Sequence, residues 1–338
     1  MAQVTTIGLD LAKHVFHLVA LNEGGREVKR KMLRRSQVLS YFAQQPPCLV
    51  AMEACATAHY WGRELENRGH RVRLIPAQHV KPYVRGNKHD YNDARGIAEA
   101  ATRPDIRGVA IKTMEQQDLQ ALQRLREGCV KERTALCNRA RGLIAEGGII
   151  IGQGVNTLRR RLPELQAEPD NGLSPFFRQL LGEVYQQLCE LDARIERYTR
   201  ELNRLAQIDD ACRRLQTIPG FGPIAASAFR CAIGDGAGFR RGRDVAAAIG
   251  LVPGQHSTGG KPVLLGITKR GNPYLRSLLV HGARAVVTQA ARKDDRLSRW
   301  INRIRAERGF NKAVVALANK LARIGWALLR HQTVYQPA

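Results

Sequence analysis

Two short apolar segments of this chain each end in a carboxylate, and this placement restricts what the chain can fold into more than any other feature. Asp10 closes the first segment and Glu53 closes the second, while Asp90 and Asp93 are three residues apart. Such segments are typical of buried strands, and residues three apart share one face of a helix. Carboxylates brought together repel one another unless a cation lies between them, and a hard cation such as magnesium takes oxygen ligands. The four residues therefore predict a divalent-metal site.

The charge of the chain indicates what such a site acts on. Among 338 residues, 54 Lys and Arg outnumber 30 Asp and Glu, giving a formal net charge of +24. A polyanionic partner is expected, so the metal site is interpreted as serving phosphodiester chemistry on nucleic acid. A membrane surface would also attract this charge. However, the sequence has no long apolar segment and begins with no signal peptide, so we expect a cytoplasmic protein with no membrane partner.

The remaining composition is typical of a globular protein. The length allows two or three domains, and a hydrophobic content of 44% supplies their cores. The seven cysteines are scattered singly, with no Cys-x-x-Cys pair, so neither a zinc site nor a disulfide framework is indicated. We expect them to be reduced residues that fill the core.

The pattern of the first hundred residues indicates a defined order of strands and helices. Three strands in a meander are expected at residues 4–9, 15–21 and 26–32. They are followed by a helix at 37–44, a strand at 48–52, a helix at 59–68, a strand at 72–75 and a helix from about 90 onward. This order is similar to the ribonuclease-H-like fold, in which carboxylates from the first strand, the fourth strand and a later helix converge at one end of the sheet. The sequence predicts such an α/β domain over residues 1–110.

A helical middle region is expected at residues 111–208. Apolar residues recur at seven-residue intervals over 114–146, at Leu122, Cys129, Leu136 and Leu143. A loop-rich connection follows, with glycines and prolines spread over residues 147–175. A second helix then carries apolar residues at alternating three-and-four spacing, a coiled-coil seam at Leu181, Val184, Leu188, Leu191, Ile195, Tyr198, Leu202 and Leu205. The seam fits either an intramolecular helical hairpin or a dimerisation arm.

The third region, residues 209–338, is expected to be mainly helical. It opens with the Ile-Pro-Gly-Phe-Gly-Pro-Ile segment at 218–224, ends in an apolar helix at 312–330, and has one glycine-rich extended interruption at 250–271. The opening segment resembles a helix-hairpin-helix turn, which presents backbone N–H groups to a phosphate. A tight turn between packed helices explains it equally well.

A second group of residues with chemical potential lies in that interruption. Residues 250–261 read Gly-Leu-Val-Pro-Gly-Gln-His-Ser-Thr-Gly-Gly-Lys, and 268–272 read Thr-Lys-Arg-Gly-Asn. Paired glycines let a backbone approach phosphate closely, Lys261, Lys269 and Arg270 can neutralise its charge, and Ser257 is a possible nucleophile. By itself, this composition is common in ordinary loops. Arg276 and Arg284, in the following helix, are further candidates for phosphate contacts. His256 is left outside the predicted site because a loop histidine usually has no catalytic role.

Together, the four acidic residues, the central seam and the motifs at 218–224, 250–261 and 268–272 resemble the DEDD-type insertion-sequence transposases. These form insertion-sequence family one-ten, with its eleven-eleven subgroup and the related Piv-type invertases. The resemblance covers nearly the whole chain. It implies a RuvC-like domain, a coiled coil and a C-terminal transposase domain, in a bacterial, nucleoid-associated protein.

The resemblance also implies an activity, a cofactor and partners. Asp10, Glu53, Asp90 and Asp93 would be Mg²⁺ ligands, and Ser257 would attack a DNA phosphorus to form a covalent intermediate. An alignment anchored on Pro253 instead makes Thr258 the nucleophile, and serine is preferred as the less hindered alcohol. The partners would be double-stranded target and donor DNA, a structured noncoding guide RNA, and further copies of the chain in a dimer assembling to a tetramer with composite active sites.

Two other functions fit parts of the sequence. A RuvC-like nuclease would hydrolyse branched DNA with metal-activated water and would tolerate loss of Ser257. A noncatalytic nucleic-acid-binding protein would remain functional when Asp10 and Asp93 are replaced by Asn. Neither accounts for all the motifs, so an RNA-guided DNA recombinase is the function that the sequence predicts.

Overall fold

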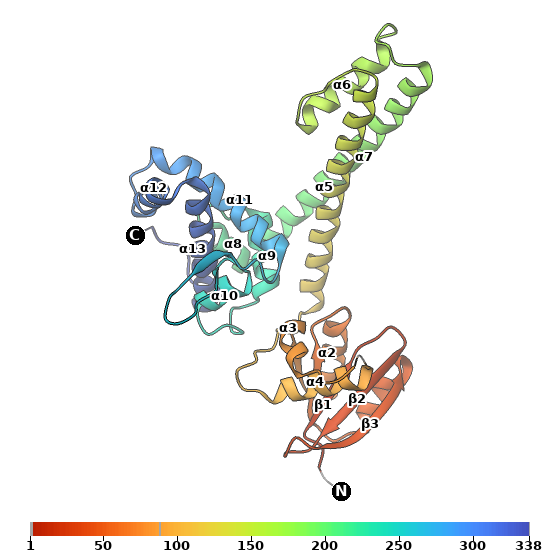
Figure 1. Ribbon diagram of the computed structural model, residues 1–338, viewed down its shortest axis with the longest axis vertical. Helices are drawn as coiled ribbons and strands as arrows, with labels where there is room; N and C mark the ends of the chain where they lie inside the picture. The colour runs from red at the N-terminus through yellow and green to blue at the C-terminus, as the bar shows by residue number, and fades with distance from the viewer. Residues whose placement is uncertain (1–2, 88, 338) are drawn as a thin grey trace. The chain divides into compact units, whose positions relative to one another are not determined.

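The computed structural model describes residues 3–87 and 89–337, and the chain forms two compact units, Met1–Gln116 and Gln117–Ala338. The predicted mixed α/β architecture is confirmed, with a sheet in the first unit and a mainly helical second unit (Figure 1). Each unit is described by itself.

The first unit is built on a five-stranded mixed sheet of order β3-β2-β1-β4-β5. The central strand β1 is antiparallel to β2 and parallel to β4, so β1, β3, β4 and β5 all end at the same edge. The strands are β1 (Thr6–Asp10), β2 (Val15–Leu21), β3 (Glu27–Arg34), β4 (Leu49–Glu53) and β5 (Arg71–Ile75).

Helices connect and cover these strands in the predicted order. They are α1 (Val38–Ala43), α2 (Ala58–Glu66) and α4 (Asp90–Thr102), together with a short helix α3 (Ala77–Val80) and two 3-10 turns, η1 (Arg35–Gln37) and η2 (Lys81–Tyr83). The alternating strand and helix pattern is confirmed. The short elements between β5 and α4 are additions that the sequence pattern did not reveal.

The two faces of the sheet carry different layers. Ile7 and Leu9 of β1 are fully buried in a core shared with α1 and α2. Because side chains alternate along a strand, Gly8 and Asp10 face the opposite side. That side is covered by α4, whose Ala94 and Ala98 are fully buried. The direction of Asp10 is therefore set by the same alternation that builds the core.

Helix α4 lies almost in backbone contact with β1, and Gly8 permits this approach. A Cβ atom at Gly8 would clash with the carbonyl oxygen of Ala94 and lie 2.6 Å from the amide nitrogen of Ala98. The small residues on both elements remove the side-chain layer that usually separates a helix from a sheet. This contact brings the first turn of α4 to the end of β1.

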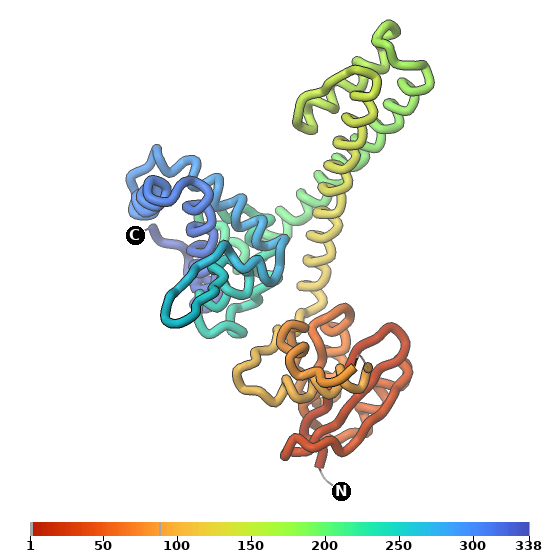
Figure 2. The backbone as a smooth tube through the Cα atoms, in the orientation of Figure 1, coloured from red at the N-terminus to blue at the C-terminus, as the bar shows by residue number. Residues whose placement is uncertain are grey.

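Helix α5 starts three residues before the second unit and opens a group of antiparallel helices, whose backbone is traced in Figure 2. They are α5 (Met114–Glu146), α6 (Val155–Ala167) and α7 (Pro175–Ile208). Buried residues from all three helices share one cluster, and Arg133 of α5 and Arg159 of α6 both form salt bridges with Asp192 of α7. The intramolecular interpretation of the predicted seam is thus supported by contacts within one chain.

Two details of the middle region differ from the prediction. The connection at 147–175 is not simply loop, because α6 lies within it and includes Pro163. The prolines and glycines of this connection indicated a loop, although α6 has an apolar face on which Leu158, Leu162 and Leu165 are buried. On α5, Leu143 is 48% exposed and Ile144 is fully buried instead. An α-helix repeats every 3.6 residues, so a strict seven-residue pattern drifts off the buried face.

The rest of the second unit packs around one helical core. It contains α8 (Asp210–Gln216), α9 (Pro223–Ile233), α10 (Gly242–Ala248), α11 (Pro273–Gln289), α12 (Arg296–Arg308), α13 (Phe310–His331) and the 3-10 turn η3 (Ala290–Arg292). The expected extended interruption is confirmed as a hairpin of β6 (Pro253–Gln255) and β7 (Leu264–Ile267).

The Ile-Pro-Gly-Phe-Gly-Pro segment joins α8 to α9 and packs closely against α11. Gly220 has φ +89°, and a Cβ there would lie 2.8 Å from the carbonyl oxygen of Gly282. The two glycines therefore let two backbones meet. This contact supports the tight-turn interpretation of the segment, and its phosphate-binding role stays a prediction.

The cysteines follow the predicted pattern only in part. All seven are free thiols, and Cys55 and Cys189 are exposed while the other five are buried. The expectation of core filling is therefore wrong for these two.

Replacing Gly8 with Ala is expected to separate α4 from β1, because the added methyl group would overlap the α4 backbone. We expect a loss of stability of about 1–3 kcal/mol or more, measured by chemical denaturation, together with loss of strand cleavage. The matched control is Gly142→Ala in α5, where a Cβ meets open space and helix propensity favours Ala. A Gly8→Ala protein as stable as the wild type would contradict this account.

Candidate metal centre and serine-bearing hairpin

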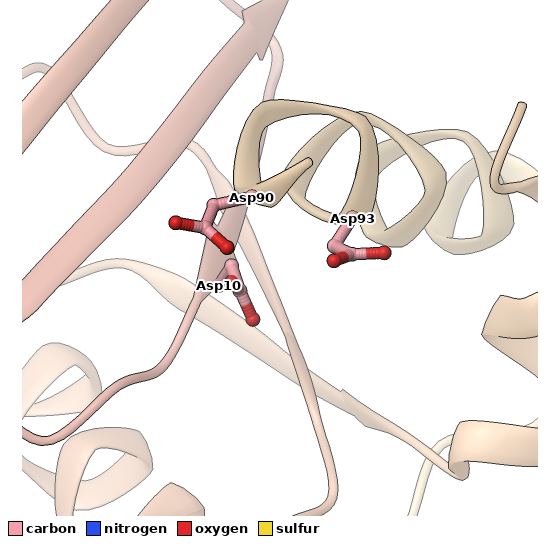
Figure 3. Close-up of side chains that lie close together, drawn as sticks. All are labelled: Asp10, Asp90 and Asp93. Carbon is pink, nitrogen blue, oxygen red and sulfur yellow. The ribbon is translucent and has the colours of Figure 1, made fainter. Parts of the chain in front are cut away.

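Three of the predicted acidic residues converge in the first unit. Asp10 is the last residue of β1, and Asp90 and Asp93 lie in the first turn of α4. One carboxylate oxygen from each residue lies within 4.8 Å of the corresponding oxygens of the other two, and Figure 3 shows the three side chains gathered between the strand end and the helix. The spacing and the oxygen donors fit one divalent cation.

Glu53 lies beside this cluster without belonging to its tightest group. It ends β4, one residue beyond the Leu9–Met52 pair that joins β4 to β1. Alternation along β4 directs it to the α4 face, like Asp10. It also interacts electrostatically with both Asp10 and Asp93. The structure therefore brings three of the predicted ligands together and places the fourth at the neighbouring strand end.

Burial and mutual repulsion raise the pKa values of Asp10 and Glu53. Burial, followed by the charges of Asp93, Asp90 and Glu53, raises the pKa of Asp10 from 3.8 to about 6. Burial and the charge of Asp93 also raise the pKa of Glu53. Both shifts mean that the folded chain without a cation disfavours the fully ionised cluster, and a bound divalent cation would reverse that preference.

The start of α4 helps to hold its two aspartates. His89 caps the helix, since its Nδ1 accepts a hydrogen bond of 3.2 Å from the backbone N–H of Tyr91. Asp90 and Asp93 follow in the first turn, where unpaired backbone N–H groups and the helix dipole stabilise negative charge. The cap thus fixes where the helix begins and which turn carries the carboxylates.

Sequence reasoning missed His17, a neighbour of the cluster. It pairs with Asp10 across the β1–β2 ladder, and its Nδ1 lies 3.4 Å from a carboxylate oxygen of Asp90. The centroids of the His17 and Tyr91 rings lie 4.8 Å apart, and the two rings are nearly perpendicular. The only signal in the sequence was the meander itself, because the cross-strand register decides which residue lies opposite Asp10.

Ser257 lies in the loop of the β6–β7 hairpin, in the second unit. Its Oγ accepts hydrogen bonds from the Gln255 side-chain amide at 2.7 Å and from the Val263 backbone N–H at 3.3 Å. The loop turns through Gly259 and Gly260, which have φ +58° and +76°, values that favour glycine. The hydroxyl is therefore exposed yet oriented by two donors.

The predicted basic contacts fall into two groups. Lys261, Lys269, Arg270 and Arg284 are exposed. Arg276 is half-buried, and its guanidinium donates to the carbonyl oxygens of Ile249 and Arg270 at 2.8 and 2.7 Å. Arg276 thus braces the loop that precedes α11, whereas the exposed cations are accessible to a polyanion.

Two protein-family models match the chain. A transposase model of the DEDD type matches residues 7–147, and the model of the transposase IS116/IS110/IS902 family matches residues 212–298. The first span contains all four acidic residues, and the second contains Ser257 and the predicted basic contacts.

Curated relatives match over nearly the full length. The chain is 49% identical to a probable family 20 transposase of Pseudomonas aeruginosa, over 99% of each chain. It is 44% identical to the transposase for insertion sequence element IS1111A of Coxiella burnetii, over 99% of this chain and 92% of the relative. It is 40% identical to the transposase for IS1328 of Yersinia enterocolitica, over 99% of each chain.

An acidic cluster on a mixed sheet, in a strongly basic chain with these relatives, defines an insertion-sequence transposase, an enzyme that cleaves and transfers DNA strands. The chain belongs to the IS110/IS116 family of DEDD transposases, whose members use a divalent metal. The predicted enzyme class and DNA partner are thereby confirmed. In the described part of the chain, no helix is long and apolar enough to cross a membrane.

The raised pKa of Asp10 makes the stability of the metal-free protein depend on pH. The folded chain keeps a proton between pH 4 and 6 that the unfolded chain releases, so the contribution of Asp10 to stability falls as pH rises through that window. We expect Asp10→Asn to raise the melting temperature at pH 8 and to change it little at pH 4, where Asp10 is protonated. The measurement is thermal denaturation in EDTA.

The control is Asp105→Asn, an exposed aspartate of the same unit. A shift in melting temperature that is the same at pH 4 and pH 8 for Asp10→Asn would contradict the repulsion described above. Adding Mg²⁺ or Mn²⁺ at pH 8 should raise the melting temperature of the wild type and have much less effect on Asp10→Asn.

Proposed function

We propose that this transposase is an RNA-guided DNA recombinase in which a RuvC-like domain supplies a magnesium site and a C-terminal domain supplies a serine nucleophile. The observation that carries the proposal is the convergence of Asp10, Asp90 and Asp93 at the end of the central strand. The β1, β4 and α4 origins of the acidic residues are those expected of a ribonuclease-H-like domain.

The donor set fits Mg²⁺. Asp10, Glu53, Asp90 and Asp93 would hold it, since all four offer hard oxygen ligands. Burial, followed by the neighbouring negative charges, raises the pKa values of Asp10 and Glu53, and a cation would compensate those charges. Bound there, the cation would neutralise charge on the attacked phosphate and favour the ionised form of the attacking hydroxyl. The chain itself holds the carboxylates at fixed spacing through the β1–α4 contact.

Ser257 is proposed as the nucleophile. Its Oγ would form a bond to the DNA phosphorus as the ester bond to the leaving strand end breaks, and the hydroxyl of the strand to be joined would later displace it. The Gln255 amide and the Val263 N–H already point at Oγ and would stabilise negative charge that develops on it. For Thr258, the hydrogen bond within the described residues involves its backbone carbonyl, which accepts from Lys261. This difference favours Ser257.

The assembly proposed is a dimer that forms a tetramer, with a three-part chain of residues 1–110, 111–208 and 209–338. Exposed apolar side chains on the long helices support self-association: Leu125 is 53% exposed and Leu143 is 48% exposed. Such residues on a helix that otherwise buries its apolar face leave surface for a second copy. The proposal includes a cytoplasmic, nucleoid-associated location, which the DNA substrate and the bacterial relatives support.

Binding of a guide RNA would explain the excess of basic residues in the chain. Sequence-independent binding by Lys and Arg fits a protein that recognises backbone while base pairing chooses the sequence. The excess of 54 basic residues over 30 acidic ones supports this division of labour.

Replacing Ser257 with Ala is expected to abolish the covalent protein–DNA adduct and to reduce strand cleavage by at least about 10³-fold, since the attacking atom is removed. The measurement is denaturing electrophoresis of the protein with labelled donor and target DNA. Thr258→Ala is the matched control and should retain the adduct. An adduct in Ser257→Ala that disappears in Thr258→Ala would assign the nucleophile to Thr258, and cleavage without adduct in Ser257→Ala would favour the water-activating nuclease.

The guide is tested by the RNA that copurifies with the expressed protein. We expect a discrete structured RNA, encoded beside the gene, with segments complementary to both target and donor. Ribonuclease treatment should abolish site-specific cleavage, and adding back the transcript should restore it, whereas a transcript with scrambled complementarity should not. Site-specific recombination by the RNA-free protein would overturn RNA guidance and leave the transposase assignment intact.

A further inference from the structure

A cavity of about 770 Å³ opens in the first unit, away from the acidic cluster. Its walls come from the β1–β2 turn and the start of β2, the end of β3 with the 3-10 turn that follows, and the first turns of α1 and α2. The chemically distinctive residues of the lining are His14, Arg34, Arg35, Ser36, Tyr60 and Trp61. Cations and aromatic rings predominate, and no carboxylate of the described residues lines it.

The cavity and the acidic cluster share one end of the sheet. Strands β1 and β3 end there and β2 begins there, since Val15 pairs with Arg34. Both Asp10 and Glu53 end strands at this same edge. The carboxylates face α4, whereas Trp61 belongs to the core on the α1 and α2 face. A strand lying across the edge of the sheet would therefore meet the acidic cluster and the cavity in succession.

Arg35 of the cavity is preorganised for an anion. The Arg35 guanidinium lies 5.1 Å from the Trp61 ring centroid and 5.9 Å from that of Phe16, so the two rings fix its position. Within the described residues, neither Arg34 nor Arg35 forms a salt bridge. An arginine held by stacking, with its N–H groups free of a carboxylate, suits bidentate recognition of a phosphate.

The aromatic wall suits a base. Tyr60 is 42% exposed, although it is large and apolar, and its ring packs edge-on against Trp61 at 5.1 Å. That contact leaves the Tyr60 ring held in place. The Trp61 Nε1–H is buried and has no acceptor among the described residues. A supported aromatic ring beside unpaired N–H donors is the combination that binds single-stranded nucleotides.

We propose that this cavity binds one unpaired nucleotide of a strand that also passes the acidic cluster, with the base stacked on Tyr60 and the phosphate held by Arg34 and Arg35. The inference rests on the strand-cleaving activity of the transposase and requires neither the guide RNA nor the serine nucleophile. A DNA strand opened at the cleavage site and an RNA strand offer the same chemistry, and the experiment distinguishes them.

The first measurement is the affinity of the full-length protein for a short fluorescent thymidine oligonucleotide. Tyr60→Ala should weaken binding by about 5- to 150-fold, the range for one stacked base, and Tyr60→Phe should bind like the wild type. Arg35→Ala should lower the slope of log affinity against log salt by about one. The matched control is Arg71→Ala, an exposed arginine at the start of β5 and so at the opposite end of the sheet, which should leave affinity and slope unchanged.

The second measurement locates the nucleotide. A single 4-thiothymidine in the oligonucleotide should crosslink to Tyr60 or a neighbouring residue of α2 on irradiation, as identified by mass spectrometry. Placing an abasic site at that position should weaken binding to the wild type and remove the penalty of Tyr60→Ala. The same oligonucleotide as RNA, with 4-thiouridine, shows which strand is preferred. A crosslink with either strand supports the subsite and identifies its source.

Two results would overturn the inference: crosslinks that map elsewhere, or Tyr60→Ala and Arg34→Gln proteins that are folded and bind like Arg71→Ala. Arg34 is exposed, so its replacement tests the cavity even if Tyr60→Ala fails to fold. Asp93→Asn separates this inference from the proposed mechanism. That variant should keep the crosslink and lose metal-dependent cleavage, whereas failure of the mechanism alone would leave the crosslink intact and the cleavage unaffected by Asp93→Asn.

Discussion

The close backbone contact between β1 and α4 is the constraint on which the candidate metal centre depends. Gly8 has no Cβ, so Ala94 and Ala98 reach the strand directly, and the first turn of α4 comes to the strand end. The core contributes the stability that holds Asp10 next to Asp90 and Asp93 despite their repulsion. The cluster is thus an electrostatically unfavourable arrangement maintained by apolar packing, as expected of a site built to receive a cation.

Much of the first unit could be predicted because its signals are local. Apolar runs, turns and a helix start mark each element, and the strand-end positions of Asp10 and Glu53 follow from them. His17 and the cavity beside Tyr60 could not be predicted, since cross-strand register and the packing of distant segments place them. The helix α6 was missed for the opposite reason: local signals, its flanking glycines and prolines, were misleading, and burial against α5 and α7 decided its structure.

The two groups of candidate catalytic residues differ in how firmly the fold holds them. Asp10 is anchored by a central strand, and the aspartates of α4 by a helix whose alanines are buried. Ser257 lies in a hairpin whose β7 strand exposes Leu264 and Leu265 at 67% and 57%. Elements with few buried contacts open most easily and are where binding orders a protein. Under the proposed function, a firmly held acidic centre and an adaptable nucleophile would suit an enzyme that engages two DNA molecules in turn.

Net charge and local charge act in opposite directions in this protein. The excess of basic residues draws a polyanion to the surface, while the acidic cluster repels the phosphate that would be cleaved. A divalent cation at the cluster removes that repulsion, so cation and nucleic acid should each bind more tightly in the presence of the other, by the same factor. Because burial, together with this repulsion, raises the pKa of Asp10, protonation competes with the cation at low pH. Under the proposed function, the fold would thereby tie engagement of the scissile phosphate to loading of the metal site.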